Sequence, residues 1–189
     1  MRHPCPGEEF SAARECRLSP LFETLTSKGA VHTQTFGWER PKWFSLNGQE
    51  EDCSYRRNAT FEVVRAECLA VREHVGVIDL TGFAKYDIHG ADAESFLNRI
   101  LANRMPKRDG GIALAHFLSR NGRILGEATV TRVASDHFYL LSAASAEMRD
   151  LDHLTQQVEP GEQVTIHNAT DERGVCLLYT SPSPRDVEE

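Results

Sequence analysis

IALAHFLSRNGRILGEATVTRV, residues 112–133, decides the fold of this chain. Asn121-Gly122 separates two apolar runs, and Asn-Gly is the strongest short-range signal for a hairpin because both turn positions favour positive φ. We therefore expect antiparallel strands over 112–119 and 123–133. The second strand carries one carboxylate, Glu127, among apolar and small residues.

The register of this hairpin follows from its loop. If Asn121-Gly122 is a two-residue loop, His116 faces Glu127 and Leu118 faces Leu125. Alternation then gives one face of the hairpin the following side chains: Leu114, His116, Leu118, Leu125 and Glu127. Two interpretations remain open. The pair is either a weak His-Glu contact on a solvated face, or a pocket acid that binds a polar ligand.

The rest of the chain alternates helical and extended patterns. Ser19-Pro20 starts a helix that stops at Gly29, and residues 30–58 form a polar connection anchored by Trp38, Trp43 and Phe44. The other expected helices cover 60–74, 93–102 and 145–158. The other expected strands cover 76–80, 83–89, 137–143 and 163–168. This order predicts an α+β fold, with helices packed on an antiparallel or mixed sheet.

Composition and spacing exclude several functions. The net charge is -7 over 189 residues, without a long basic run or a long apolar stretch, so we expect neither nucleic-acid nor membrane partners. Five cysteines without a CxxC motif favour reduced thiols in a bacterial cytoplasm or a mitochondrial matrix. The eight histidines form no HxH or HExxH spacing, so we expect no metal site. Without GxGxxG, this chain should not bind a dinucleotide by itself.

Several segments carry a resemblance to a known family: LSPLFETLTSKGAV (18–31), FGWERPKWF (36–44), the long run from 55 to 103, HFLSRNGRILGEATVTRV (116–133) and NATDERGV (168–175). The chain resembles the folate-binding aminomethyltransferase domain of the glycine-cleavage T-protein. It is more similar to the FAD-dependent dimethylglycine and sarcosine dehydrogenases, which fuse that domain behind a flavin domain. GWERPKWF distinguishes the fused branch, in which a similar segment ends the linker domain.

The resemblance implies a domain division. Residues 1–50 correspond to the end of the linker domain, and residues 51–175 to the N-terminal part of a T-protein-like folate-binding domain. The chain is thus expected to be a fragment that lacks the flavin domain and the later folate-site residues. The final CLLYTSPSPRDVEE (176–189) turns abruptly to Ser, Pro and charge. We expect it to be a non-native tail, with a genuine disordered tail as the alternative.

The resemblance also assigns site residues. Glu127 falls where the family has an acid beside the reduced pterin, although T-proteins carry Asp-Asp where this chain has Gly126-Glu127. Leu114, Tyr139 and Leu141 fall at pterin-lining positions, and Phe83 falls where an apolar residue closes the pocket. We expect Glu127 to be catalytic and His116 to orient it. Tyr139 shares a face with Glu127 only if the loop is Ser135-Asp136-His137, or if a β-bulge shifts the register.

The function implied is that of an N-methylglycine dehydrogenase. FAD in the missing domain would oxidise an N-methyl group, and tetrahydrofolate bound by this domain would accept the one-carbon unit. The fragment by itself is expected to be inactive. Two alternatives remain open: a glycine-cleavage aminomethyltransferase, which would take its one-carbon unit from a lipoyl-bearing partner, and a folate-binding module without catalysis.

Overall fold

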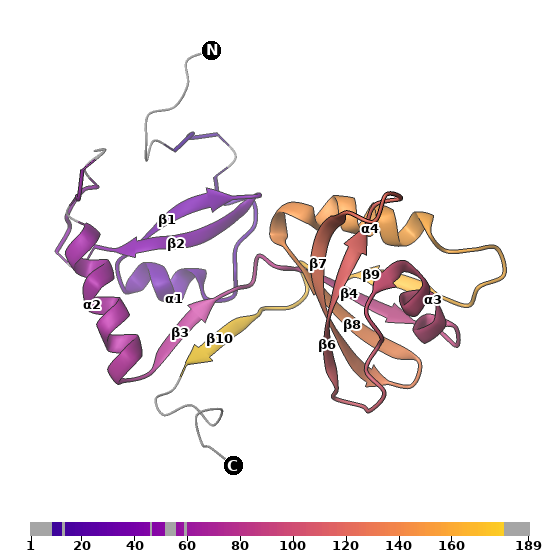
Figure 1. Cartoon of the computed structure of the whole chain (residues 1–189). Helices are drawn as coiled ribbons and strands as arrows, with labels where there is room; N and C mark the ends of the chain where they lie inside the picture. Colours follow the sequence, from indigo (N-terminus) through magenta and orange to yellow (C-terminus); the bar gives the residue numbers. More distant parts are fainter. Residues whose placement is uncertain (1–8, 13, 46, 52–55, 59, 180–189) are drawn as a thin grey trace. The chain divides into compact units, whose positions relative to one another are not determined.

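Residues Gly82–Arg173 form one structural unit, and the segments on either side of them form another. We call these the central unit and the flanking unit and describe each by itself. The computed structural model describes residues 9–12, 14–45, 47–51, 56–58 and 60–179 (Figure 1). None of the helices in these ranges is long and apolar enough to cross a membrane.

The central unit is built on a six-stranded sheet with the order β5-β6-β7-β8-β4-β9. Its strands are β4 (Ala84–His89), β5 (Leu101–Ala102), β6 (Ile112–Leu118), β7 (Ile124–Ala134), β8 (His137–Ser142) and β9 (Thr165–Asn168). All neighbouring strands pair antiparallel. Two helices accompany the sheet, α3 (Ala93–Ile100) and α4 (Glu147–Gln156), and a 3₁₀ turn (Ala144–Ala146) precedes α4. The expected α+β fold with an antiparallel sheet is confirmed.

The two faces of this sheet differ in burial. One face and the two helices supply the core, whose large buried side chains are Tyr86, Ile88, Phe96, Leu97, Phe117, Val130, Phe138, Leu140 and Leu154. By strand alternation and the observed pairing, the second face carries Leu114, His116, Glu127, Thr129, Thr131, Tyr139, Leu141, Lys85, Asp87, His89 and His137. The residues implied by the resemblance therefore lie on the face opposite to the helices.

The β6–β7 hairpin has the predicted pairing at its centre and a different loop. His116 pairs with Glu127 as predicted, whereas Leu118 pairs with Ile124 rather than with Leu125. The Ser119 amide donates to the carbonyl of Arg123 at 2.8 Å, so the loop has three residues and ends on Gly122 with φ 72°. A β-bulge between Phe117 and Leu118 compensates for the extra loop residue. The predicted two-residue loop was wrong. The extra loop residue and the bulge shift the register in opposite directions, so His116 still pairs with Glu127.

The β7–β8 hairpin resolves the position of Tyr139. Ala134 pairs with His137, which leaves Ser135-Asp136 as a two-residue loop. The register shifts between Arg132 and Ala134, where Val133 is the extra residue of a bulge. Tyr139 consequently pairs with Thr131 and lies on the same face as Glu127. Of the two arrangements that were expected to allow this, the β-bulge is the one observed.

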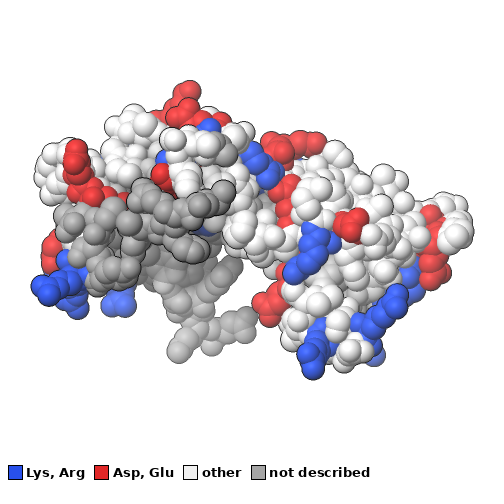
Figure 2. Space-filling model, turned by 90° about the horizontal axis from the view of Figure 1, so that it is seen from above, with Lys and Arg blue, Asp and Glu red and all other residues white. Residues whose placement is uncertain are grey.

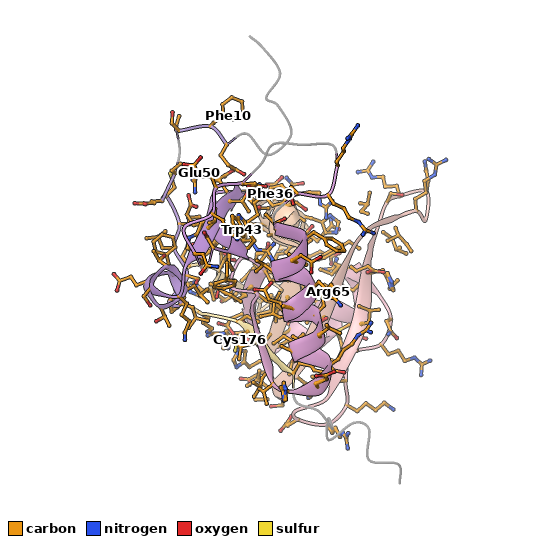
Figure 3. The ribbon with its side chains drawn as sticks, turned by 90° about the vertical axis from the view of Figure 1, so that its left-hand side faces the viewer. Phe10, Phe36, Trp43, Glu50, Arg65 and Cys176 are labelled. Atoms are coloured by element: carbon orange, nitrogen blue, oxygen red, sulfur yellow. The ribbon has the colours of Figure 1, made fainter. Side chains whose placement is uncertain are left out.

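The flanking unit contains a hairpin where a connection was expected. The hairpin consists of β1 (Ala30–Thr35) and β2 (Trp38–Phe44), and its turn residues Phe36 and Gly37 have φ values of 53° and 86°. Trp38 and Trp43 are buried, so the expected aromatic anchoring is confirmed for these two residues, whereas Phe44 is half-buried. Helix α1 (Phe22–Ser27) begins after the expected Ser19-Pro20 and packs against β1, while α2 (Thr60–Glu73) packs against β2 (Figure 3).

The described end of the chain forms a strand. β10 (Cys176–Tyr179) pairs antiparallel with β3 (Gly76–Asp79), and all four β10 residues are exposed. β10 is therefore paired along one edge but is not covered. The rest of the expected non-native tail, residues 180–189, lies outside the described residues.

Candidate functional site

A hollow of about 360 Å³ on the second face brings four of the predicted site residues together. Phe83, Leu114 and Leu141 supply apolar walls, and Glu127 supplies the one carboxylate. The remaining lining comes from small or hydroxyl-bearing residues: Ala128, Thr129, Ser142 and Ala143. We call this feature the Glu127 hollow. Its residues come from β6, β7, β8 and the segments that adjoin β4 and β8, so the sheet register holds them in place.

Glu127 is more exposed than a buried pocket acid would be. Its side chain is 64% exposed, and its Oε1 lies 3.3 Å from Nε2 of His116, whose side chain is 28% exposed. The structure thus contains the weak cross-strand contact between His116 and Glu127 that was one of the two interpretations. The same pair lies beside an apolar hollow, as the alternative of a pocket acid requires. A carboxylate in this position can accept a proton or a hydrogen bond from a ligand that covers the hollow.

Tyr139 lies on the same face but does not line the hollow. The guanidinium of Arg173 lies 5.1 Å from the centroid of the Tyr139 ring, which is a cation–π distance. Partial burial raises the pKa of the Tyr139 hydroxyl, and Arg173 only partly offsets this effect. The structure therefore places Tyr139 beside Arg173 and Asp87, and not beside Glu127.

A charged network around Asp87 was missed at the level of sequence. The carboxylate of Asp87 is buried; it accepts a hydrogen bond from His137 Nε2 at 2.8 Å and pairs with Arg173 Nη2 at 2.5 Å. Burial would raise the pKa of Asp87, but the bonds from Arg173 and His137 outweigh it and hold that pKa below its usual value. The spacing Asp87-x-His89 in the sequence indicated that these two side chains share a face of one strand. His137 comes close to Asp87 only through the pairing of β4 with β8, which the spacing does not show.

Lys85 is a second buried charged residue, and residue spacing in the sequence did not predict its burial. Its side chain is fully buried, and Nζ donates to the backbone carbonyls of Phe83 at 2.8 Å and Thr170 at 3.0 Å. A buried ammonium needs such acceptors. These bonds fix the backbone at Phe83, and so Lys85 supports one wall of the Glu127 hollow without lining it.

The fold can now be compared with known structures. A glycine cleavage system aminomethyltransferase T from Bartonella henselae superposes with a TM-score of 0.71 at 22% sequence identity, covering 87% of this chain and 41% of that one. The fold therefore defines a T-protein-like α+β class. The family model described as the GCVT N-terminal domain matches residues 21–185, and the chain belongs to this family.

The sequence relatives include proteins that are named as dehydrogenases. Dimethylglycine dehydrogenase, mitochondrial, from Mus musculus is 38% identical over 186 residues, which is 96% of this chain and 21% of that protein. Sarcosine dehydrogenase, mitochondrial, from Homo sapiens is 26% identical over 224 residues, which is 97% of this chain and 24% of that protein. The chain thus spans less than a quarter of the length of either relative.

Proposed function

We propose that this chain is the tetrahydrofolate-binding part of an FAD-dependent N-methylglycine dehydrogenase of the dimethylglycine or sarcosine type. The observation that carries the proposal is the 38% identity to dimethylglycine dehydrogenase over nearly the whole chain. The proposed partners are folate and a flavin domain of the same parent chain. Residues 1–50 would end the linker domain, and residues 51–175 would begin the folate domain.

The residues of the Glu127 hollow fit a flat ring system with polar edges. Phe83, Leu114 and Leu141 offer apolar contact to a pterin, and Glu127 at the rim offers a hydrogen-bond acceptor to its N–H groups. Tetrahydrofolate, when bound, supplies the nitrogen nucleophiles that take up a one-carbon unit. The sequence contains no GxGxxG motif of the kind that binds a dinucleotide. FAD is therefore assigned to another part of the parent.

Glu127 would act on charge and protons. A carboxylate close to a reacting nitrogen stabilises developing positive charge and accepts the proton that the nitrogen loses. Its partner His116 would fix the orientation of the carboxylate through the 3.3 Å contact. The apolar walls would limit access of water to the reacting carbon, which otherwise would be lost as formaldehyde.

Glu127→Gln in the full-length parent tests this proposal. The amide keeps the shape of the side chain but can neither accept the proton nor carry the charge, so one-carbon transfer to folate should fall by about 100-fold. Amine oxidation should stay normal, and formaldehyde should appear instead. Glu172→Gln is the matched control, because Glu172 is an exposed acid paired with His167 away from the hollow. Unchanged transfer in Glu127→Gln would remove this residue from the mechanism.

A second candidate function, aminomethyl transfer in glycine cleavage, is supported by membership of the GCVT N-terminal domain family. A glycine-cleavage enzyme would use the same hollow with a lipoyl-bound donor and would not oxidise an N-methylated amine. A folate-binding module without catalysis would bind reduced folate and leave formaldehyde release unchanged. Thermal protection of the 189-residue chain by reduced folate tests binding. Amine oxidation by the parent separates the dehydrogenase from the glycine-cleavage enzyme, and the effect of folate on formaldehyde release separates one-carbon transfer from binding alone.

A further inference from the structure

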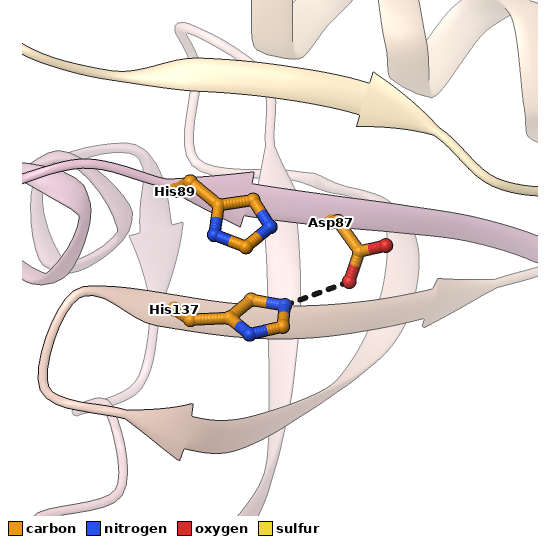
Figure 4. A group of neighbouring side chains, drawn as sticks. All are labelled: Asp87, His89 and His137. Carbon is orange, nitrogen blue, oxygen red and sulfur yellow. Dashed lines mark hydrogen bonds and ion pairs between the residues drawn. The ribbon is translucent and has the colours of Figure 1, made fainter.

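Three metal-ligand side chains converge at one end of the sheet in the central unit. Asp87, His89 and His137 each offer a ligand atom, and these atoms lie within 4.8 Å of one another (Figure 4). We call this group the His–Asp cluster. We propose that the His–Asp cluster is a binding site for a divalent transition-metal ion of the zinc class, held by two imidazole nitrogens and one carboxylate oxygen.

The strand register brings these residues together. β4 and β8 pair antiparallel, with His89 opposite His137 and Asp87 opposite Tyr139. Asp87 and His89 are two residues apart on one strand, so their side chains leave the same face of the sheet. The carboxylate therefore lies diagonally across from His137, and His137 Nε2 is 2.8 Å from Asp87 Oδ1.

The distances suit a shared ion. Zn²⁺ binds imidazole nitrogen and carboxylate oxygen at about 2.0–2.2 Å, which separates two ligand atoms on one ion by about 3 Å or slightly more. The Asp87–His137 contact is already close to this separation. The ion would take the place of the proton that Nε2 donates to Asp87, and the neutral imidazole would carry its one N–H proton on Nδ1.

His89 supplies the movable ligand. Its ring stacks on that of His137, with centroids 3.8 Å apart and planes inclined by 21°. Stacked rings direct their lone pairs nearly parallel, so one ion cannot lie in the plane of both. His89 is exposed at the end of β4, however, and its ring can turn toward Asp87 without disturbing the core. Metal binding should therefore break the stacking.

Arg173 tunes the carboxylate. Its Nη2 lies 2.5 Å from Asp87 Oδ2, and its Nη1 donates to Oδ1 at 3.1 Å. The bond to Oδ2 orients the carboxylate. An ion on Oδ1 would replace the hydrogen bond from His137 and would share that oxygen with Arg173 Nη1. The positive charge of Arg173 opposes a second cation nearby, so the arginine lowers the affinity while it fixes the geometry.

The site is separate from the proposed folate site. None of the residues of the His–Asp cluster lines the Glu127 hollow. The inference therefore stands or falls independently of the proposed function. Two imidazoles with one carboxylate are a ligand set suited to Zn²⁺, Ni²⁺ or Cu²⁺, whereas Mg²⁺ and Ca²⁺ prefer oxygen ligands.

Calorimetric titration of the untagged 189-residue chain with ZnCl₂ tests the proposal. The thiols are first alkylated, because Cys16, Cys68 and Cys176 are exposed and would bind zinc themselves. We expect one ion per chain. His89→Gln and His137→Gln should each weaken binding by about tenfold or more, because each removes one of three ligands. Arg173→Gln should strengthen it, because a positive charge beside the ion is lost.

His167→Gln is the matched control. His167 is an exposed imidazole of the same unit that pairs with Glu172 outside the His–Asp cluster. This variant should bind zinc like the unchanged chain, and circular dichroism should show that every variant is folded. NMR should show zinc-dependent shifts of the His89 and His137 ring signals. Absence of binding overturns the proposal, as does binding that His89→Gln and His137→Gln leave unchanged.

Discussion

Glu39 is a buried carboxylate of the flanking unit, and its charge is fully paired. Its two oxygens accept hydrogen bonds from Arg14 Nε and Nη2, each at 2.7 Å, and Oε1 also accepts one from the Glu15 amide at 2.8 Å. The bonds from Arg14 lower the pKa of Glu39 despite its burial. A bidentate ion pair of this kind contributes more to the free energy of unfolding than a surface ion pair, because the carboxylate is not hydrated.

Glu39→Gln should therefore destabilise the flanking unit by about 2 kcal/mol, since charge-assisted bonds become neutral ones and a buried acceptor is lost. Urea unfolding followed by tryptophan fluorescence measures this, because the two tryptophans of the chain are Trp38 and Trp43. Glu62→Gln is the control, because Glu62 pairs with Arg65 on an exposed face. Equal midpoints for the two variants would contradict the prediction.

Asp87 makes the stability of the central unit depend on pH in the acidic range. Its pKa is below the usual value in the folded protein, so the ionised form stabilises the fold fully above the ordinary value of about 3.9, and this stabilisation is lost as the pH falls through the folded pKa. Asp87→Asn should reduce the difference in unfolding free energy between pH 5 and pH 3. Urea titrations followed by circular dichroism measure it, with Asp152→Asn on the surface of α4 as control.

At the scale of elements, the turn after β4 depends on a glycine. Gly90 has φ 135°, and a Cβ there would lie 1.9 Å from the backbone oxygen of Gln163. Because the clashing atom belongs to the backbone, relieving the clash would require the chain around Gln163 to shift. Gly122 in the β6–β7 loop has φ 72° with nothing within 4 Å of its Cβ position. Both glycines have a positive φ that other residues rarely adopt, but only at Gly90 would an added Cβ also collide with the backbone.

Gly90→Ala should therefore destabilise the central unit by about 3 kcal/mol or more, whereas Gly122→Ala should cost about 1 kcal/mol for its backbone conformation alone. Urea unfolding followed by circular dichroism compares the two variants. A Gly90→Ala midpoint no lower than that of Gly122→Ala would show that the segment around Gln163 can yield, contrary to the geometry described above.

The sequence predicted the hairpins better than it predicted their details. The His116–Glu127 pairing was predicted correctly, although the predicted loop was wrong, because the bulge beside Phe117 offsets the extra loop residue. The pairing of Leu118 was wrong, since Asn-Gly permits both two-residue and three-residue loops. The bulge at Val133 was expected only as one of two alternatives, because no residue type identifies a bulge by itself.

Two further features were beyond the sequence for specific reasons. The β1–β2 hairpin was missed because its turn places Phe36 at positive φ, where phenylalanine is rare, and because the second strand contains Pro41, a residue uncommon within strands. The His–Asp cluster was missed because the search for metal ligands used spacing within one segment. Its third member comes from another strand, which only the β4–β8 pairing identifies.

At the scale of the whole molecule, both charged and apolar side chains are exposed. Figure 2 shows acidic and basic side chains scattered over the face in view, with uncharged surface between them. By contrast, Ile112, Leu114 and Phe83 on or beside the second face of the sheet are exposed by 67%, 51% and 39%. Neighbouring exposed apolar side chains favour association between molecules.

Ile112→Lys should therefore weaken self-association of the 189-residue chain by about tenfold, because a charge would have to be desolvated at the contact. Sedimentation velocity over a range of concentrations measures this. Met148→Lys is the control, because Met148 is 70% exposed on α4, away from the second face. Equal association of both variants would show that the sheet face is not the surface involved.

The pairing of β3 with β10 has a consequence for biosynthesis. The entire central unit lies between these two strands in the chain, so the ribosome completes it before Cys176 emerges. The nascent central unit can fold while the edge of β3 is still without its strand partner. An unpaired edge invites strands from other chains. A translational stall just before Cys176 would therefore leave the edge of β3 open to strands from other chains.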